Sequence, residues 1–198
     1  MTLITDLMIL ESDVWTGHKH GMTPLFRAAG LGHTADLQRE IASGADVNAT
    51  DDTGWTPLMV AAALCHDDAI SILVQKGANA SAQDQNGDNA LIAAAASHRC
   101  DKEDEKHPFA LIRTLLKAGA SLNAQNLDGE TALIAAVKAE NVQAVRMLLK
   151  AGADRNLKDK RGETALAYSQ QREQENVESY YHDDAVRIFL MLSKSSTQ

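Results

Sequence analysis

The sequence has little of several features on which common protein classes depend. Its 198 residues include only two cysteines, Cys65 and Cys100, which is too few for a disulfide framework. Only 4% of the residues are aromatic, although 44% are hydrophobic. No apolar run approaches the ~20 residues that a membrane span requires. The N-terminal stretch MTLITDLMIL has no basic residue before its apolar part, unlike a signal peptide. We therefore expect a cytoplasmic protein that does not contact membranes.

Basic residues are also in short supply. The chain has 27 acidic residues against 19 Lys and Arg, which gives a formal net charge of −8. The imbalance lies in residues 1–86, with 11 acidic and 4 basic residues, whereas residues 87–198 have 16 and 15. Nucleic acids and anionic membranes are bound by cationic surfaces. We expect no nucleic-acid partner, and the acidic front half predicts a basic protein partner.

Motifs of common enzyme classes are absent. The sequence contains no G-x-S-x-G, no P-loop and no H-E-x-x-H. One loop gathers side chains that can bind metals, but their spacing fits no zinc pattern, and a charged solvated loop is the simpler interpretation. These side chains are His98, Cys100, Asp101, Glu103, Asp104 and His107. We predict no enzymatic activity, no metal and no cofactor.

What the chain does have is a phrase that begins with glycine and recurs five times. It reads GMTPLFRAA, GWTPLMVAA, GDNALIAAA, GETALIAAV and GETALAYSQ, starting at Gly21, Gly54, Gly87, Gly129 and Gly162. The spacing is 33 residues from Gly21 to Gly54 and again from Gly129 to Gly162. A fixed period of this size predicts a stacked solenoid, and solenoids present extended binding surfaces.

Each position of the repeated unit has a recognisable structural role. The third residue is Thr, or Asn89 in the third unit, which predicts an N-cap, and Pro24 and Pro57 suit the first helical turn. An outer helix follows, with apolar residues at helical spacing. Gly44, Gly77, Gly119 and Gly152 then occupy expected C-cap positions. The unit is predicted to be a helix–turn–helix with a projecting finger.

These motifs resemble the ankyrin repeat, which has a 33-residue period and a T-P-L-H-x-A pattern. Thr-Pro-Leu stands at 23–25 and 56–58, and Gly-Ala-Asp-x-Asn at 44–48 and 152–156. The resemblance implies an all-α solenoid of helix–turn–helix units with short β-hairpin fingers. It also implies that His33 and His66 tie neighbouring loops together by hydrogen bonds. Ankyrin-like proteins bind protein partners through the concave face and the finger tips.

The whole chain, 1–198, is predicted to form one domain of this type. We expect an N-terminal half-repeat cap at 1–20, repeats at 21–53, 54–86, 87–128 and 129–161, and an expanded C-terminal capping repeat at 162–198. Insertions near 98–108 and 171–184 fall at the same point of the unit, so both should emerge on the same edge. They are either solvated loops or part of a binding face. Glu40 replaces an apolar residue of the other units and should be partly exposed.

The finger tips and inner-helix ends differ from unit to unit, whereas the framework residues are shared. We interpret the shared residues as specifying the fold and the variable ones as binding the partner. Trp55 is the strongest candidate because tryptophan is enriched among binding hot spots, the alternative being that it packs against a neighbouring finger. The predicted partner-binding residues are Trp55, Met22, Leu31, Asp52, Thr53, Leu64, Gln85, Asn86, Asp88, Leu127, Asp128 and Glu130.

The predicted function is non-enzymatic protein binding. Because the sequence has no second domain that could act in cis, we expect a stoichiometric inhibitor or an immunity-type protein that is monomeric when unbound. The alternative is an adaptor or scaffold that joins two protein partners. An inhibitor should form a 1:1 complex with one partner, whereas an adaptor should hold two partners at once.

Overall fold

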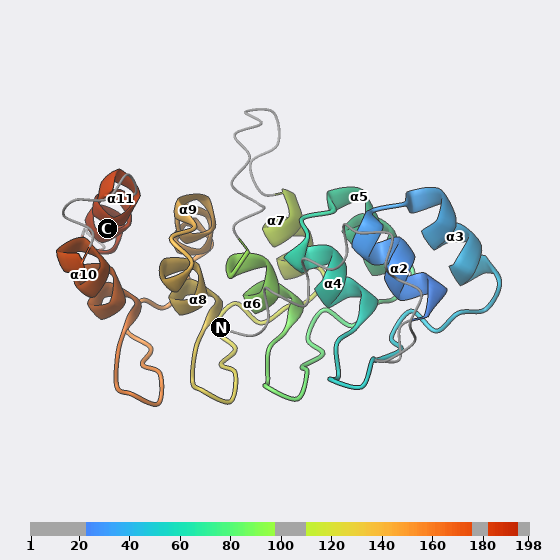
Figure 1. Ribbon diagram of the computed structural model, residues 1–198, viewed down its shortest axis with the longest axis horizontal. Coiled ribbons are helices and arrows are strands. Elements are labelled where there is room, and N and C mark those ends of the chain that lie inside the picture. The colour runs from blue at the N-terminus through green and yellow to red at the C-terminus, as the bar shows by residue number, and fades with distance from the viewer. Residues whose placement is uncertain (1–22, 98–109, 176–181, 194–198) are drawn as a thin grey trace.

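The computed structural model describes residues 23–97, 110–175 and 182–193, and in these ranges every regular element is a helix. The helices stand in two layers along one row (Figure 1). The inner layer consists of α2 (Pro24–Leu31), α4 (Pro57–Ala63), α6 (Ala90–Ala95), α8 (Ala132–Lys138) and α10 (Ala165–Glu175). The outer layer consists of α3 (Thr34–Ala42), α5 (Asp67–Gln75), α7 (Ala110–Lys117), α9 (Val142–Lys150) and α11 (His182–Ser193). Each helix packs against its partner in the other layer and against the next helix of its own layer, as a solenoid requires.

The inner helices begin where the shared third residue of the unit predicts. The hydroxyl oxygens of Thr23, Thr56, Thr131 and Thr164 accept hydrogen bonds from backbone N–H groups of the first helical turn, at 3.2–3.4 Å. Asn89 caps α6 in the same way, with two bonds of 3.0 Å. These bonds satisfy N–H groups that have no partner within the helix. The predicted N-caps are therefore confirmed.

One continuous hydrophobic core runs between the two layers. Leucines at one repeat-equivalent position of the inner helices and aliphatic residues at one position of the outer helices are at most 1% exposed. They are Leu25, Leu58, Leu91 and Leu133 in the inner layer and Leu37, Ile70, Ile112 and Val145 in the outer layer. No single unit buries these side chains alone, so each repeat depends on its neighbours for stability.

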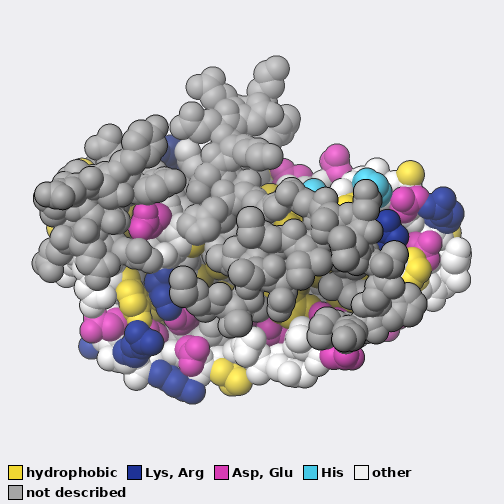
Figure 2. Space-filling view, in the orientation of Figure 1, with side chains coloured by type: hydrophobic (Ala, Val, Ile, Leu, Met, Phe, Trp, Pro, Cys, Tyr) yellow, Lys and Arg dark blue, Asp and Glu magenta, His cyan; other side chains and the backbone are white. Residues whose placement is uncertain are grey.

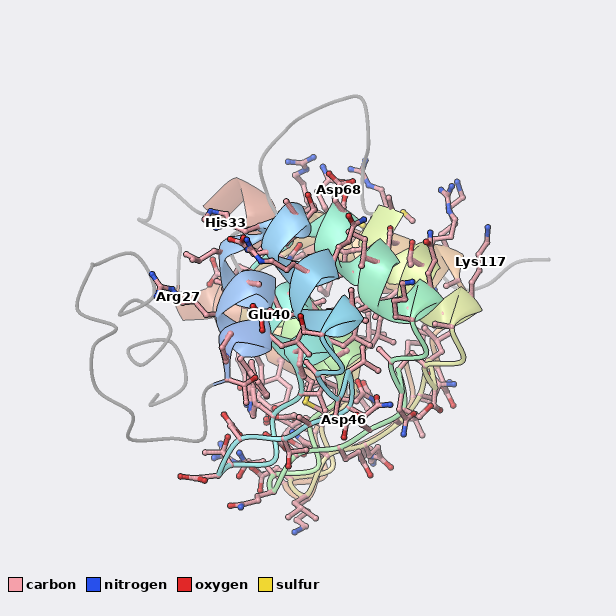
Figure 3. The ribbon with its side chains drawn as sticks, turned by 90° about the vertical axis from the view of Figure 1, so that its right-hand side faces the viewer. Arg27, His33, Glu40, Asp46, Asp68 and Lys117 are labelled. Carbon is pink, nitrogen blue, oxygen red and sulfur yellow. The ribbon has the colours of Figure 1, made fainter. Side chains whose placement is uncertain are left out.

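Glu40 departs from the apolar pattern of its repeat position. The equivalent residues Leu73, Leu115 and Leu148 are fully buried, whereas Glu40 is half-buried. It lies at the α2–α3 end of the array (Figure 3). A half-exposed carboxylate keeps part of its hydration, which avoids the cost of burying an unpaired charge. The expectation of partial exposure is confirmed.

Four fingers of equal length project from one side of the helices (Figure 1). We define them as residues 45–55, 78–88, 120–130 and 153–163. Each follows a glycine with φ near +90°, the left-handed backbone predicted for Gly44, Gly77, Gly119 and Gly152. Within the described residues the fingers are tight turns with two isolated antiparallel bridges, Gln125 with Thr131 and Lys158 with Thr164. The predicted hairpins are therefore present as turns, two of them closed by single bridges, without extended strands in the described part of the chain. None of the helices described here is long and apolar enough to cross a membrane.

Candidate protein-binding surface

A buried or half-buried Asp or Asn closes the turn of every finger. We call Asp51, Asp84, Asn126 and Asp159 the finger-base residues. In each, one side-chain oxygen accepts two backbone N–H bonds of 2.8–3.0 Å, from the residues two and four positions later. An Asx side chain that satisfies its own turn in this way fixes the backbone of the turn. The tip of each finger is consequently held in one shape.

Backbone hydrogen bonds join the tips of neighbouring fingers into one row. Gln85 donates to the Thr53 carbonyl at 3.0 Å, Leu127 to the Asn86 carbonyl at 2.7 Å, and Lys160 to the Asp128 carbonyl at 2.8 Å. The close approach of one finger to the next requires glycine as the tenth residue of the finger. At Gly87, with φ of +77°, a Cβ would lie 2.8 Å from the Leu127 nitrogen. A larger residue there would have to separate the fingers.

Trp55 links the first finger to the second. Its indole Nε1 donates to Asp84 Oδ2 at 2.9 Å, its backbone N–H donates to Asp51, and its half-buried ring packs against the cluster of Phe26 and Val60. The sequence made Trp55 the strongest candidate for a partner contact, but the structure gives its side chain a contact within the protein. The ring has both an apolar surface to cover and a donor to satisfy, and the neighbouring finger meets both needs. The alternative of packing against that finger is the one observed.

The second and third fingers are joined by a pair of reversed polarity. Asp88 occupies the position of Trp55, and its Oδ1 accepts a bond of 2.8 Å from Asn126 Nδ2. Trp55 is a donor and its partner Asp84 is an acceptor, whereas Asp88 is an acceptor and its partner Asn126 is a donor. Burial raises the pKa of the Asp88 carboxyl, and neighbouring carboxylates, Asp84 first, act in the same direction although the Asn126 bond opposes them. Asp88 is thus part of the framework and only half exposed.

The carboxylates of Glu130 and Asp159, at the third and fourth fingers, each have a partner on an inner helix. Lys138 Nζ pairs with Glu130, and the Tyr168 hydroxyl donates to Asp159 Oδ2 at 2.5 Å. The Lys138 ammonium also lies 5.3 Å from the centre of the Tyr168 ring, within cation–π range. Burial, followed by the bond to Asp159 and its negative charge, raises the pKa of Tyr168 to about 12. Glu130 is therefore occupied within the protein.

Asp159 shows how strongly these turns favour a charged carboxylate. Burial acts to raise its pKa, but the hydrogen bonds from Tyr168 and from the backbone of Glu163 and Arg161 hold the pKa below its usual value. Hydrogen bonds to the ionised form of an acid favour that form. The network at the fourth finger is consequently a stabilising one, with its charges already satisfied.

The loops that join each inner helix to its outer helix are tied together as well. His66 Nε2 donates to the Gly30 carbonyl at 2.9 Å, which confirms the predicted loop-tying role for this histidine. At the same position of the fourth repeat, Asn141 donates to the Ser97 carbonyl at 2.8 Å. His33, by contrast, lies 3.5 Å from Asp36 of its own helix. Cys65, which precedes His66, is disulfide-bonded.

The eighth and ninth residues of every finger are exposed and form its tip. We call these the tip residues: Asp52 and Thr53, Gln85 and Asn86, Leu127 and Asp128, and Lys160 and Arg161. Six of them were predicted as partner-binding residues, and the structure brings those six into one row with Lys160 and Arg161. Leu127 is 60% exposed, and the described residues hold only one other exposed large hydrophobic side chain, Leu190 at 49%. An apolar side chain held at the tip of a rigid turn is available for contact.

Three predicted residues lie elsewhere. Leu64 is buried, with 6% of its surface exposed, because it packs in a cluster with Phe26 and Val60, so the expectation of an exposed Leu64 was wrong. Leu31 is half-buried at the end of α2. Met22 lies outside the described residues, as do the half-repeat cap at 1–20 and the loop around Cys100.

Sequence reasoning missed the finger-base residues and Tyr168. A signal for the first was present: an Asp or Asn stands three residues before the glycine that opens each of the last four units. Asp51, Asp84, Asn126 and Asp159 share this register, and Asx residues favour turns. No periodic signal pointed to Tyr168, which belongs to the last, atypical repeat.

Comparison with known families agrees with this geometry. A model of ankyrin repeats in three copies matches residues 2–84 and 25–103, and a model of ankyrin repeats in many copies matches residues 115–169. No curated protein matches the chain. Ankyrin repeats are a non-enzymatic interaction fold. The chain therefore belongs to the ankyrin-repeat family and is a protein–protein interaction module built as a helical solenoid.

Proposed function

We propose that this protein binds one protein partner in a 1:1 complex through the tip residues and the adjoining concave face. The role that fits best is that of a stoichiometric inhibitor or immunity-type protein. A standard interface buries ~1,600 Å² in total, and we expect the complex to bury about that area.

One observation supports this proposal above the others: most framework contacts come from the finger bases and finger ends, although the side chains of the tip residues Thr53 and Gln85 also bond within the protein. Trp55 and Asp88 bond to the next finger and Glu130 pairs with Lys138 of α8, whereas the Leu127 side chain is exposed at a tip whose backbone is fixed. A surface that is ordered before binding loses little entropy on association. The proposed contact set is therefore the tip residues, with Leu127 as the apolar anchor.

The charge of the front fingers favours a basic surface on the partner. The first finger has Asp46, Asp51 and Asp52 and no Lys or Arg. Complementary charge mainly raises the association rate and the specificity. We also propose that the unbound protein is a monomer and does not bind nucleic acid, given its net charge of −8.

The limits of the domain and its location in the cell are proposals too. The family match from residue 2 supports a capping unit at 1–20. A cytoplasmic location was expected from composition, but disulfides are rare in the cytosol and Cys65 is disulfide-bonded. Alkylation of thiols at lysis, with and without reductant, decides between the compartments: a thiol that reacts without reductant supports the cytoplasm.

The experiment that tests the function is purification of the protein with its partner from the native source, using matched leucine variants. Leu127→Asp places a charge at the proposed anchor. Leu190→Asp makes the same change at the other leucine that is exposed in the described part of the chain, on α11. We expect a 1:1 complex with wild type and with Leu190→Asp, and at least a tenfold weaker complex with Leu127→Asp, as for a hot spot worth about 1.4 kcal/mol or more.

Two outcomes would contradict the proposal. Equal loss of binding by the two variants would place the interface away from the tips. Simultaneous binding of two different partners would support the adaptor role instead of the inhibitor role. Activity of the captured partner, measured with and without the protein, separates inhibition from simple binding.

A further inference from the structure

The side chain at the eighth position of the finger changes character in order along the row. It is acidic at Asp52, neutral and polar at Gln85, apolar at Leu127 and basic at Lys160. All four residues are exposed. Arg161 follows Lys160 and adds a second positive charge to the last tip. Along the edge formed by the tips, Figure 2 shows acidic side chains at the end of the front fingers, whereas basic side chains appear only toward the opposite end, where acidic ones lie among them.

The basic end of the row is not neutralised within the described part of the chain. There, neither Lys160 nor Arg161 forms an ion pair, and the ion pairs present join His33 and Arg39 to Asp36 and Lys138 to Glu130. The nearest acid of the same finger, Asp159, is engaged by Tyr168 and by two backbone N–H groups. The Arg161 charge also acts on the Asp159 carboxylate, but both cations are exposed and can meet an external group.

The order of the tips is fixed in space. The backbone bonds from Gln85 to Thr53, from Leu127 to Asn86 and from Lys160 to Asp128 hold each tip against the next. In a row fixed in this way, the acidic end and the basic end cannot approach each other. A partner must match both ends at once, because a charge opposite a like charge is unfavourable and selects against that partner.

We propose that the finger row binds a protein segment whose charge changes along its length: basic opposite Asp52, apolar at Leu127, and acidic opposite Lys160 and Arg161. This inference rests on the proposed function and extends it, since it adds an acidic element of the partner and a contact site at the fourth finger. A uniformly basic partner meets attraction at the first finger and repulsion at the fourth.

A library of random 16-residue peptides displayed on phage tests the proposal without knowledge of the partner. The wild type is compared with Lys160→Glu/Arg161→Glu and with Arg146→Glu/Lys150→Glu. The second double variant makes the same change in composition at exposed positions of α9, away from the fingers. Circular dichroism and the Tm of each variant verify that the fold is intact, because all four positions are on the surface.

We expect the wild type and the α9 variant to enrich peptides with a basic end, a central apolar residue and an acidic end. The finger variant should enrich uniformly basic peptides, and it should bind the wild-type peptides at least tenfold more weakly. Uniformly basic peptides selected by the wild type would overturn the proposal, as would the absence of any charge pattern or of any enriched peptide. Peptides that bind both double variants equally would overturn it as well.

The same peptides separate this inference from the proposed function. If the wild type selects uniformly basic peptides whose binding is lost in Leu127→Asp but retained in Leu190→Asp, the tips bind protein as proposed and only the bipolar pattern is wrong. If the selected peptides bind Leu127→Asp as tightly as the wild type, both the bipolar pattern and the proposed binding of a partner by the tips are wrong.

Discussion

Replacement of Trp55 by phenylalanine tests whether this side chain joins the first two fingers. Phenylalanine keeps an aromatic ring against the cluster around Phe26 but has no N–H for Asp84 Oδ2, which lies 2.9 Å from the indole nitrogen. A hydrogen bond to a charged group contributes about 1.5–3 kcal/mol. Because Trp55 is half-buried and Asp84 keeps its two backbone donors, we expect a loss of about 1 kcal/mol. For a chain of this size that lowers the Tm by about 2–4 °C.

A double-mutant cycle with Asp84→Asn isolates the contact. Asparagine can still accept the two backbone bonds, but its amide group would then face the Trp55 donor. Each single variant should lower the free energy of unfolding in urea, and the double variant should lose about 1 kcal/mol less than the sum. Trp55→Ala removes the packing too and should cost about 2–3 kcal/mol, somewhat less than a fully buried tryptophan.

Two results would contradict a structural role for Trp55. If Trp55→Phe unfolds like the wild type, and the cycle is additive, the indole bond to Asp84 has no structural weight. If Trp55→Phe also binds the partner at least tenfold more weakly at unchanged stability, the sequence-based view of Trp55 as a free hot spot is correct after all.

Four further substitutions probe the same row of fingers. Gly87→Ala should lower the free energy of unfolding by about 2 kcal/mol or more, because it adds a close contact to the strain of a left-handed residue. Gly162→Ala, with φ of +80° and open space around its Cβ, should lower it by only about 1 kcal/mol. Equal losses of stability in urea would argue against the close approach of the fingers at Gly87. Tyr168→Phe should lower stability by about 1–2 kcal/mol at pH 7. The lowered pKa of Asp159 provides stability above pH 3.8 that is lost as the pH falls through the folded-state pKa, so the difference in stability between variant and wild type should shrink in acid. A difference that stays constant with pH would show that Tyr168 does not act through the ionised Asp159. Asp88→Asn should raise stability at pH 7 by about 0.5 kcal/mol, since the raised pKa of Asp88 favours the folded state only at low pH. Equal stability of wild type and variant at every pH from 3 to 7 would contradict this prediction.

The sequence was a good guide wherever the same residue type recurs in each unit. Thr23, Thr56 and Thr131 are N-caps, and Gly44 and Gly77 have the left-handed backbone that their position predicted. These features are local: a cap or a turn depends on the few residues around it. Repetition makes the local signal visible several times, which is why the fold could be predicted.

The sequence was a poorer guide where a residue differs between units but is matched to a residue of the next finger. Trp55 with Asp84 and Asp88 with Asn126 are pairs of one donor and one acceptor, and each pair is formed by two fingers. The two residues of a pair are 29 or 38 positions apart in the sequence, so a variable residue that is bonded in this way looks like a free one. Leu64 was misjudged for a related reason, since its burial depends on side chains of the preceding repeat as well as its own.

The central claim is that the finger bases hold the array together while the tips bind the partner. Hydrogen–deuterium exchange of the isolated 1:1 complex tests it most directly. The account predicts that binding slows exchange in the peptides that cover residues 52–53, 85–86, 127–128 and 160–161 and leaves the outer helices α5 and α9 unchanged. Slower exchange confined to the outer helices, with the finger peptides unaffected, would contradict it.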